Sequence, residues 1–156
     1  MKTYLSQAED KGAKTQFATF SVNGRLYGID VMKVQEVTKP LQVTLMRTAP
    51  SFIKGLINLR GQIATAIDLS ELFGLTNNLE SEKMTVVCRV DDVLLSLLVD
   101  SIGDVIEVSE SQFEKSPPTI AHTTRSFMQG VYKTEGTILS VINLESIINE
   151  LDKKCA

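Results

Sequence analysis

The sequence contains few of the residues on which catalysis or metal binding depends. Its only histidine, His122, lies in a polar segment that we expect to be a loop, where a histidine is more often solvated than catalytic. Its only cysteines are Cys88, in an apolar run, and Cys155, near the end of the sequence. A metal site would need a second histidine or clustered cysteines, and two cysteines so placed suggest no disulfide framework. We therefore expect no catalytic residue, no metal site and no cofactor.

Nucleotide-binding loops and a nucleic-acid-binding surface are also missing. The nine glycines never fall into the spacings GxGxxG or GxxxxGK[ST], whose backbone amides cradle phosphates. The net charge is −3, the basic residues are scattered and tryptophan is absent. A small barrel that binds single strands combines a basic groove with exposed aromatic side chains, so that function is an alternative that the composition does not favour.

Long apolar runs are absent as well. No segment approaches roughly 18 consecutive apolar residues, the length that a membrane-spanning helix needs. Residues 1–14 are polar and of mixed charge, without the apolar stretch of a signal peptide. We therefore expect a cytoplasmic protein that does not insert directly into the membrane.

What the sequence does contain is a succession of short strand-like runs separated by turn residues. Asn23-Gly24 and Arg60-Gly61 each separate two such runs, and Asn-Gly in this setting is typical of a tight hairpin turn, because both residues tolerate positive φ. A short helical turn fits within Val31–Val37, and Gln42–Met46 is predicted to be a further strand. The second half of the chain adds strand-like runs at 85–90, 93–99, 131–133 and 138–142.

Two segments have the pattern of helices. Asp68, with Glu71 three residues later, is the predicted N-cap of a short helix that ends at Gly74. Residues 143–153 are predicted to form a C-terminal helix, with an apolar face made of Leu144, Ile147, Ile148 and Leu151.

The two halves of the chain also resemble each other. At one constant spacing, residues of the first half match residues of the second: Phe52 with Phe127, Gly55 with Gly130, Gly61 with Gly136, Asp68 with Asn143 and Leu69 with Leu144. Upstream, residues 34–37 match 102–105 at a slightly different spacing, as loop-length variation would produce. A duplicated unit of about five short strands and a helical turn favours two small barrels over an open sheet, because closure removes exposed edges.

The repeat suggests how the chain is organised. We expect a polar leader at residues 1–16 and a single domain at 17–150. Within it, the first barrel would cover about 17–75, the second about 84–142, and the C-terminal helix about 143–153. The polar stretch 76–83 is the predicted linker between the halves, and the two barrels would share an apolar seam.

Charged residues distinguish one half of the repeat from the other. Arg60 precedes the hairpin glycine, where the second half has Glu135, and it is flanked by apolar Leu59 and Ile63. If the repeats superpose, Glu36 and Arg60 lie on one barrel and could approach each other. An exposed ion pair adds only about 0–1 kcal/mol to stability, so such a pair is better suited to orienting side chains beside a groove where a partner docks. Two unrelated surface charges are equally compatible with the pattern.

Two segments resemble the signatures of the CheW family of chemotaxis coupling proteins. The first is Tyr27–Val37, and the second is Phe52–Gly61, which keeps an Asn-Leu-Arg-Gly core and is extended by Ile67–Leu69. The likeness spans about residues 17–150. One departure is Thr65, where the family commonly has a proline.

The resemblance implies a mainly β fold of two intertwined five-stranded SH3-like barrels that share a hydrophobic core, with short helices and a C-terminal helix. It also implies an adaptor that couples the cytoplasmic tips of chemoreceptors to the regulatory domain of the histidine kinase CheA. Such an adaptor would be recruited from the cytoplasm to membrane-associated receptor arrays. The residues carried over to the receptor-binding groove are Val34, Glu36, Gly55, Asn58 and Arg60, while the kinase-binding residues are left open.

Two alternatives remain beside this interpretation. One, from the same class, is a scaffold of this family that serves a different chemosensory kinase pathway. The other, from a different class, is the single-stranded nucleic-acid-binding barrel considered above.

Overall fold

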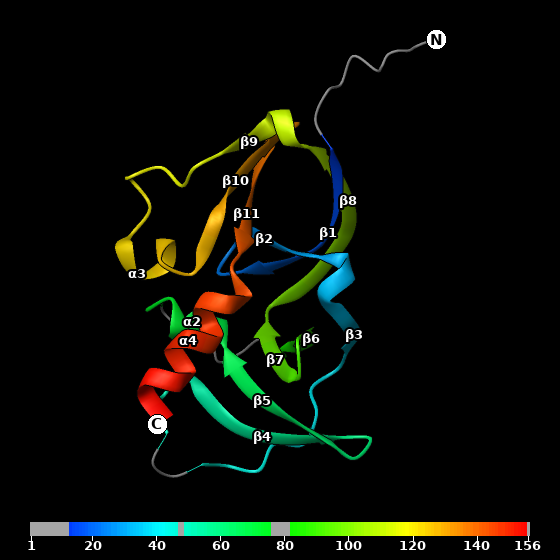
Figure 1. The fold of residues 1–156 in the computed structure, drawn as a ribbon, viewed down its shortest axis with the longest axis vertical. Helices are drawn as coiled ribbons and strands as arrows, with labels where there is room; N and C mark the ends of the chain where they lie inside the picture. The colour runs from blue at the N-terminus through cyan, green and yellow to red at the C-terminus, as the bar shows by residue number, and fades with distance from the viewer. Residues whose placement is uncertain (1–12, 47–48, 76–81, 156) are drawn as a thin grey trace.

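The strands of the chain form two sheets that lie one above the other along the long axis in Figure 1. The structure is a computed structural model that describes residues 13–46, 49–75 and 82–155. The upper sheet has the strand order β8-β1-β2-β11-β10-β9, and the lower sheet has the order β3-β6-β7-β5-β4. The predicted mainly β fold with a few short helices is confirmed. We call the two sheets the upper barrel and the lower barrel.

The upper barrel is closed by the chain that follows β8. Its strands are β1 (Lys14–Val22), β2 (Arg25–Asp30), β8 (Ser101–Ser109), β9 (Phe113–Glu114), β10 (Met128–Thr134) and β11 (Thr137–Ile142). Neighbouring strands are antiparallel except β2 and β11, which are parallel. A single 3₁₀ turn, η2 (Glu110–Gln112), leads from β8 into β9, and β9 pairs with β10 at the opposite end of the strand order. The first and last strands are therefore joined.

The lower barrel is closed in the same way by one residue. Its strands are β3 (Val34–Thr38), β4 (Ile53–Leu59), β5 (Gln62–Asp68), β6 (Met84–Val90) and β7 (Val93–Val99). Only β5 and β7 run parallel. After β3 the chain reaches Thr44, whose N–H and carbonyl each bond to the backbone of Leu56 in β4 at 2.8 Å.

The predicted strand Gln42–Met46 is wrong, because only Thr44 of that segment pairs with another strand. Leu45 is 78% exposed and Met46 is 38% exposed, so the apolar residues do not alternate between solvent and core as a half-buried strand requires.

Each barrel combines strands from both halves of the sequence. Strands β1 and β2 belong to the upper barrel, whereas β3, β4 and β5 belong to the lower one; β6 and β7 complete the lower barrel, and β8 returns to the upper one. The predicted division into barrels at about 17–75 and 84–142 is therefore wrong, although the barrels are intertwined as expected. After each initial hairpin the third strand crosses over, so β3 pairs with β6 and β8 pairs with β1.

The predicted leader and the predicted linker both overlap residues outside the described ranges. Strand β1 begins at Lys14, so the predicted leader 1–16 extends too far, and its residues 1–12 lie outside the described residues. The predicted linker 76–83 falls mostly on residues 76–81, which also lie outside them.

The internal repeat is confirmed by matching local geometry. Strands β4 and β10 each have a register shift just before the matched glycines, Gly55 and Gly130. In both halves the residue before the helix donates its backbone N–H to the carbonyl of the matched phenylalanine: Asp68 to Phe52 at 2.9 Å, and Asn143 to Phe127 at 2.8 Å. The same turn into a helix is therefore built twice.

The helices are short apart from the last. Besides η2, they are η1 (Val31–Lys33), α2 (Leu69–Leu72), α3 (His122–Arg125) and α4 (Leu144–Cys155). The predicted cap at Asp68 is confirmed, because its side chain accepts from the Ser70 N–H at 3.0 Å. The matched residue Asn143 caps α4 in the same way, accepting from the Ser146 N–H at 3.1 Å. The apolar face predicted for α4 also faces the core. His122 opens α3 with an exposed side chain, so its segment is a short helix and not a loop.

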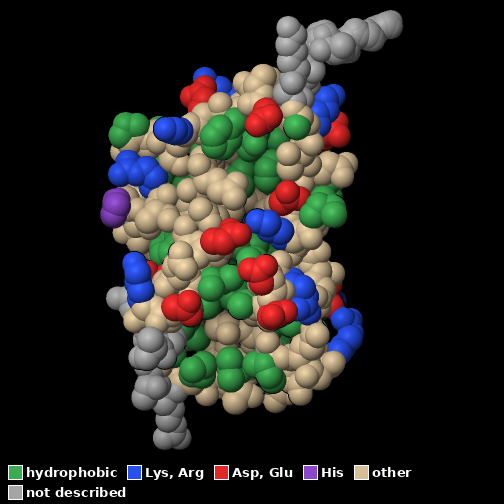
Figure 2. All heavy atoms as spheres, in the orientation of Figure 1, with side chains coloured by type: hydrophobic (Ala, Val, Ile, Leu, Met, Phe, Trp, Pro, Cys, Tyr) green, Lys and Arg blue, Asp and Glu red, His purple; other side chains and the backbone are tan. Residues whose placement is uncertain are grey.

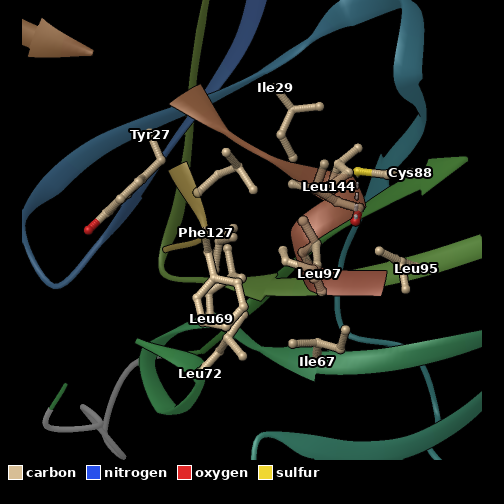
Figure 3. Packing of buried hydrophobic residues seen from close by; sticks show 14 of the residues in the cluster. Tyr27, Ile29, Ile67, Leu69, Leu72, Cys88, Leu95, Leu97, Phe127 and Leu144 are labelled. Carbon is tan, nitrogen blue, oxygen red and sulfur yellow. Dashed lines mark hydrogen bonds between the residues drawn. The ribbon is translucent and has the colours of Figure 1, made fainter. Parts of the chain in front are cut away.

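The main hydrophobic core lies where the two barrels meet. Figure 3 shows side chains from β2, from β5, β6 and β7, and from α2 and α4 converging there, among them Tyr27, Ile67, Leu95, Leu97 and Leu144. Cys88 belongs to this core, and burial raises the pKa of its thiol to about 12, so it acts as a small apolar residue as expected. A separate group inside the lower barrel, which we call the lower-barrel cluster, consists of Leu59, Ala64, Val87 and Leu94 with Leu41 against it.

Candidate functional site

The tip of the β4–β5 hairpin carries the predicted Asn-Leu-Arg-Gly segment. Arg60 has φ of 53° and Gly61 has φ of 86°, the left-handed conformations that a tight hairpin turn requires. The Asn58 side chain accepts a hydrogen bond from the Gly61 N–H at 3.0 Å. Asn58 therefore stabilises the turn. The turn directs Arg60 outward, and its side chain is 74% exposed.

The structure brings Glu36 and Arg60 together. The Arg60 guanidinium donates to both carboxylate oxygens of Glu36, with Nη2 lying 3.4 Å from Oε2. Glu36 lies on β3 and its side chain is 22% exposed, so the carboxylate is much less accessible than its partner. The two sequence signatures therefore meet at this ion pair, as the sequence suggested they could. A pair this exposed adds only about 0–1 kcal/mol to stability, so its geometry matters more than its energy.

The other two predicted site residues lie elsewhere on the lower barrel. Val34 is partly buried and packs against the main core, opposite Cys88 in the register of β3 and β6. Gly55 is buried where Thr44 bridges to β4, and it has no side chain to present to a partner. The five predicted residues thus share one barrel, but they do not form one contiguous cluster of side chains.

Of the two apolar residues that flank Arg60 in the sequence, Leu59 and Ile63, only Ile63 is exposed beside it. Ile63 is 58% exposed and pairs with Asn58 across the hairpin, so the two side chains share a face. Leu59, in contrast, is buried in the lower-barrel cluster. Arg60, Asn58 and Ile63 together present a charge, an amide and an apolar side chain at the hairpin tip.

Sequence reasoning missed Arg89 on β6. Its Nε donates to Gln35 at 3.1 Å and its Nη2 donates to Gln62 at 2.7 Å. Gln35 precedes Glu36, and Gln62 follows Gly61, so Arg89 contacts both segments that carry the ion pair. The available signal was an arginine inside the otherwise apolar run from Val86 to Val90, but nothing local shows which strands it reaches.

A cavity of about 820 Å³ lies away from this site, on the upper barrel. Its lining comes from β2, β10, β11 and the segment before α3, and includes Leu26, Val131, Ile138 and Pro117. None of the five predicted site residues lines it. Across residues 13–46, 49–75 and 82–155, no three His, Cys, Asp or Glu side chains are grouped so that they could hold a metal ion.

The distribution of surface charge and the length of the helices concern the binding of nucleic acid and the crossing of a membrane. Figure 2 shows acidic and basic side chains interspersed over the face drawn, not separated into a basic stripe. Within the part of the chain that the structure describes, no helix is long and apolar enough to cross a membrane.

Comparison with known families identifies the class to which this fold and site belong. Residues 16–152, nearly the whole chain, match the CheW-like domain family. The chain belongs to this family.

Named relatives agree with the family assignment over most of their length. The chemotaxis protein CheW of Treponema pallidum is 32% identical over 145 residues, which cover 88% of this chain and 85% of that protein. The chemotaxis protein CheW of Rhizobium meliloti is 27% identical over 142 residues, which cover 90% and 92%. The crystal structure of the scaffolding protein TtCheW from Thermoanaerobacter tengcongensis superposes with a TM-score of 0.76 at 32% identity, covering 83% of this chain and 89% of that one.

Proposed function

We propose that this protein is a non-catalytic scaffold in chemotaxis signalling, which couples the cytoplasmic tips of chemoreceptors to the regulatory domain of the histidine kinase CheA. The family match over residues 16–152, with relatives named as chemotaxis and scaffolding proteins, supports this function. One observation carries the site: the two segments that resemble the family signatures meet at the Glu36–Arg60 ion pair. The protein would act in the cytoplasm, where receptor arrays recruit it to the membrane.

The proposed receptor site comprises Val34, Glu36, Gly55, Asn58 and Arg60, with different tasks. Arg60 makes the charged contact, Glu36 orients it, and Asn58 fixes the turn that presents it. Gly55 lets the Thr44 segment close the lower barrel beside the site. Val34 would fix the position of β3, which carries Glu36, by packing against the main core. A helical receptor tip would dock against such a surface by apolar contact, with the charges setting its orientation.

The kinase domain would bind a second face, whose residues we leave open. An interface of standard size buries about 800 Å² on each partner, which this small protein can supply beside a receptor contact. The receptor would then signal by shifting the equilibrium between two arrangements of the receptor–scaffold–kinase assembly. Such a shift requires contacts that differ between the two arrangements.

Two alternative functions lead to different binding results. A scaffold of the same family in another chemosensory pathway would bind a different kinase domain through the same surfaces. A single-strand-binding barrel would instead bind oligonucleotides with a steep salt dependence. The relatives named above give no support to the second alternative.

The direct test is an NMR titration of the protein with a receptor tip fragment and, separately, with the kinase regulatory domain. Saturable shifts around Val34, Glu36 and Arg60 with the receptor fragment, and a different set with the kinase domain, are expected of a coupler with two faces. Absence of shifts with both partners would leave only the family and the fold established.

The substitution Arg60→Glu is expected to weaken receptor binding by roughly five- to thirtyfold, because it places two carboxylates together and removes a central arginine. Binding is measured by isothermal titration calorimetry, and circular dichroism checks the fold. The matched control is Lys133→Glu, which reverses a 67% exposed cation that is ion-paired with Glu114 on the upper barrel. If Arg60→Glu unfolds the protein, Arg60 is structural and the site assignment is wrong.

A further inference from the structure

Arg89 links the two segments on which the proposed receptor site depends. Its hydrogen bonds to Gln35 and Gln62 span from β3 to the first residue of β5. The guanidinium is a rigid planar fork, so donating to two acceptors on different strands fixes the distance between those strands. Arg89 is partly buried, whereas Arg60 is largely exposed.

The strand register places Arg89 at the rim of the lower-barrel cluster. Residues directly opposite each other in an antiparallel pair share a face of the sheet. Arg89 lies opposite Leu94, Gln62 opposite Leu59 and Glu36 opposite Val87, and each of these apolar partners belongs to that cluster. The polar side chains therefore surround one end of the apolar cluster, beside the hairpin tip.

The ion pair alone is too weak to hold the hairpin tip in one position. Arg60 has a long exposed side chain, and a surface pair of this kind contributes little net stability. Arg89 fixes the tip through Gln62, two residues beyond Arg60, and fixes β3 through Gln35, one residue before Glu36. A surface held in its binding conformation before the partner arrives loses less conformational entropy on binding.

We propose that Arg89 is a positioning residue for receptor binding, which acts by holding the Arg60 hairpin tip against β3. This inference rests on the proposed function, because the affinity it controls is that for the receptor. Arg89 could instead contact the receptor directly. A direct contact would still contribute to affinity after Arg60 is replaced by alanine, whereas a positioning effect would be lost.

The experiment is a double-mutant cycle in the full-length protein, with the receptor tip fragment as the titrant in calorimetry. Arg89→Met removes the donors and keeps most of the apolar stem. It is expected to weaken binding by roughly three- to tenfold in the natural sequence and by less than about twofold when Arg60 is already alanine. Lys133→Met on the upper barrel serves as the matched control. An unchanged affinity for Arg89→Met, or the same loss with and without Arg60, overturns the proposal.

A second measurement separates positioning from general stability. In the free protein, Arg89→Met is expected to shift and broaden the Arg60 Nε–H resonance, while circular dichroism stays that of the folded chain. Arg89→Lys is expected to resemble Arg89→Met, because one ammonium cannot span both glutamines. Binding restored by lysine would show that charge alone matters and would overturn the positioning role.

Failure of this inference is distinguishable from failure of the proposed function. If Arg60→Ala weakens binding and Arg89→Met does not, the receptor site stands and the role of Arg89 is wrong. If Arg60→Ala itself leaves the affinity unchanged, the receptor site is wrong, and the positioning role is overturned with it.

Discussion

Gly55 lies on β4, where the Thr44 bridge closes the lower barrel, and Gly130 lies on β10, where β9 closes the upper barrel. A Cβ added at Gly55 would lie 2.0 Å from the Thr44 carbonyl oxygen, and the residue has φ of 144°. A Cβ added at Gly130 would lie 2.6 Å from the Glu114 carbonyl oxygen and 2.4 Å from the Phe113 ring. Both glycines therefore allow the closing segment to approach the backbone, which explains why the repeat has glycine at this position twice.

Gly55→Ala is expected to lower the free energy of unfolding by about 3 kcal/mol, because it adds a clash with a backbone atom to a strained φ. Urea denaturation followed by circular dichroism measures this change. Gly61→Ala is the control, since Gly61 also has positive φ but has no atom within 4 Å of the added Cβ, and it should cost only about 1–2 kcal/mol. Equal losses at the two positions would contradict the closure argument.

At the scale of elements, the turn between β1 and β2 is tied to the lower barrel by Asp100, which follows β7. The Asn23 N–H donates to Asp100 Oδ2 at 2.7 Å, and Lys83 Nζ donates to Oδ1 at 2.6 Å. The Ser70 hydroxyl of α2 in turn donates to the Asn23 side chain at 2.9 Å. The Asp100 carboxylate thus joins the β1–β2 turn of the upper barrel to Lys83, and the Asn23 side chain of the same turn joins it to α2.

The pKa of Asp100 reflects this network. Burial raises the pKa, but the hydrogen bonds from Lys83 and Asn23 and the charge of Lys83 together outweigh it, so the pKa lies below its ordinary value. Because the folded state holds the charged form, the stabilisation is present above the unfolded pKa, near pH 4, and is lost as the pH falls through the folded pKa.

Asp100→Asn is therefore expected to lower the free energy of unfolding by about 1–2 kcal/mol at neutral pH, because it removes a charged acceptor. The difference from the natural sequence should shrink below about pH 4, where the carboxylate becomes protonated in the unfolded chain and then in the folded one. Urea denaturation at several pH values measures it. Asp92→Asn, an exposed carboxylate at the β6–β7 turn, is the control, and a pH-independent loss for Asp100→Asn would contradict the argument.

Local elements of this fold could be predicted from the sequence because their causes are local. The Asn23-Gly24 and Arg60-Gly61 turns follow from the tolerance of positive φ, and the caps Asp68 and Asn143 follow from side-chain acceptors before apolar runs. The Glu36–Arg60 contact could be suggested only because the repeat and the family resemblance placed both residues on one barrel.

Long-range pairing could not be predicted in the same way. Many segments of a β protein share a similar alternation of apolar residues. The pattern therefore does not show that β3 leaves the barrel of the preceding β1–β2 hairpin and pairs with β6. The bridge at Thr44 and the hydrogen bonds of Arg89 also depend on strands that are distant in sequence. These features depend on how the whole chain is assembled.

At the scale of the whole molecule, most strand pairings among the described residues that are not hairpins join one half of the sequence to the other, and the exception is β9 with β10. Four pairings do so, namely β1 with β8, β2 with β11, β3 with β6 and β5 with β7. The first half alone retains the hairpins β1–β2 and β4–β5 and the single bridge from Thr44 to Leu56, with β3 unpaired. Isolated two-stranded hairpins are marginally stable in water, so neither barrel has an independent folding unit within one half.

A fragment of residues 13–75 is therefore expected to be unfolded, as is a fragment of residues 82–155, although each matches one copy of the repeat. Mixing the two at equal concentration should restore the circular dichroism spectrum and the dispersed amide NMR resonances of the intact chain, because the four lost pairings can form between fragments. A mixture of either fragment with a scrambled version of the other is the control. Cooperative unfolding of residues 13–75 alone would show that the barrels can form without exchanging strands. The exchange of strands between the two halves of the chain would then be dispensable for forming a barrel.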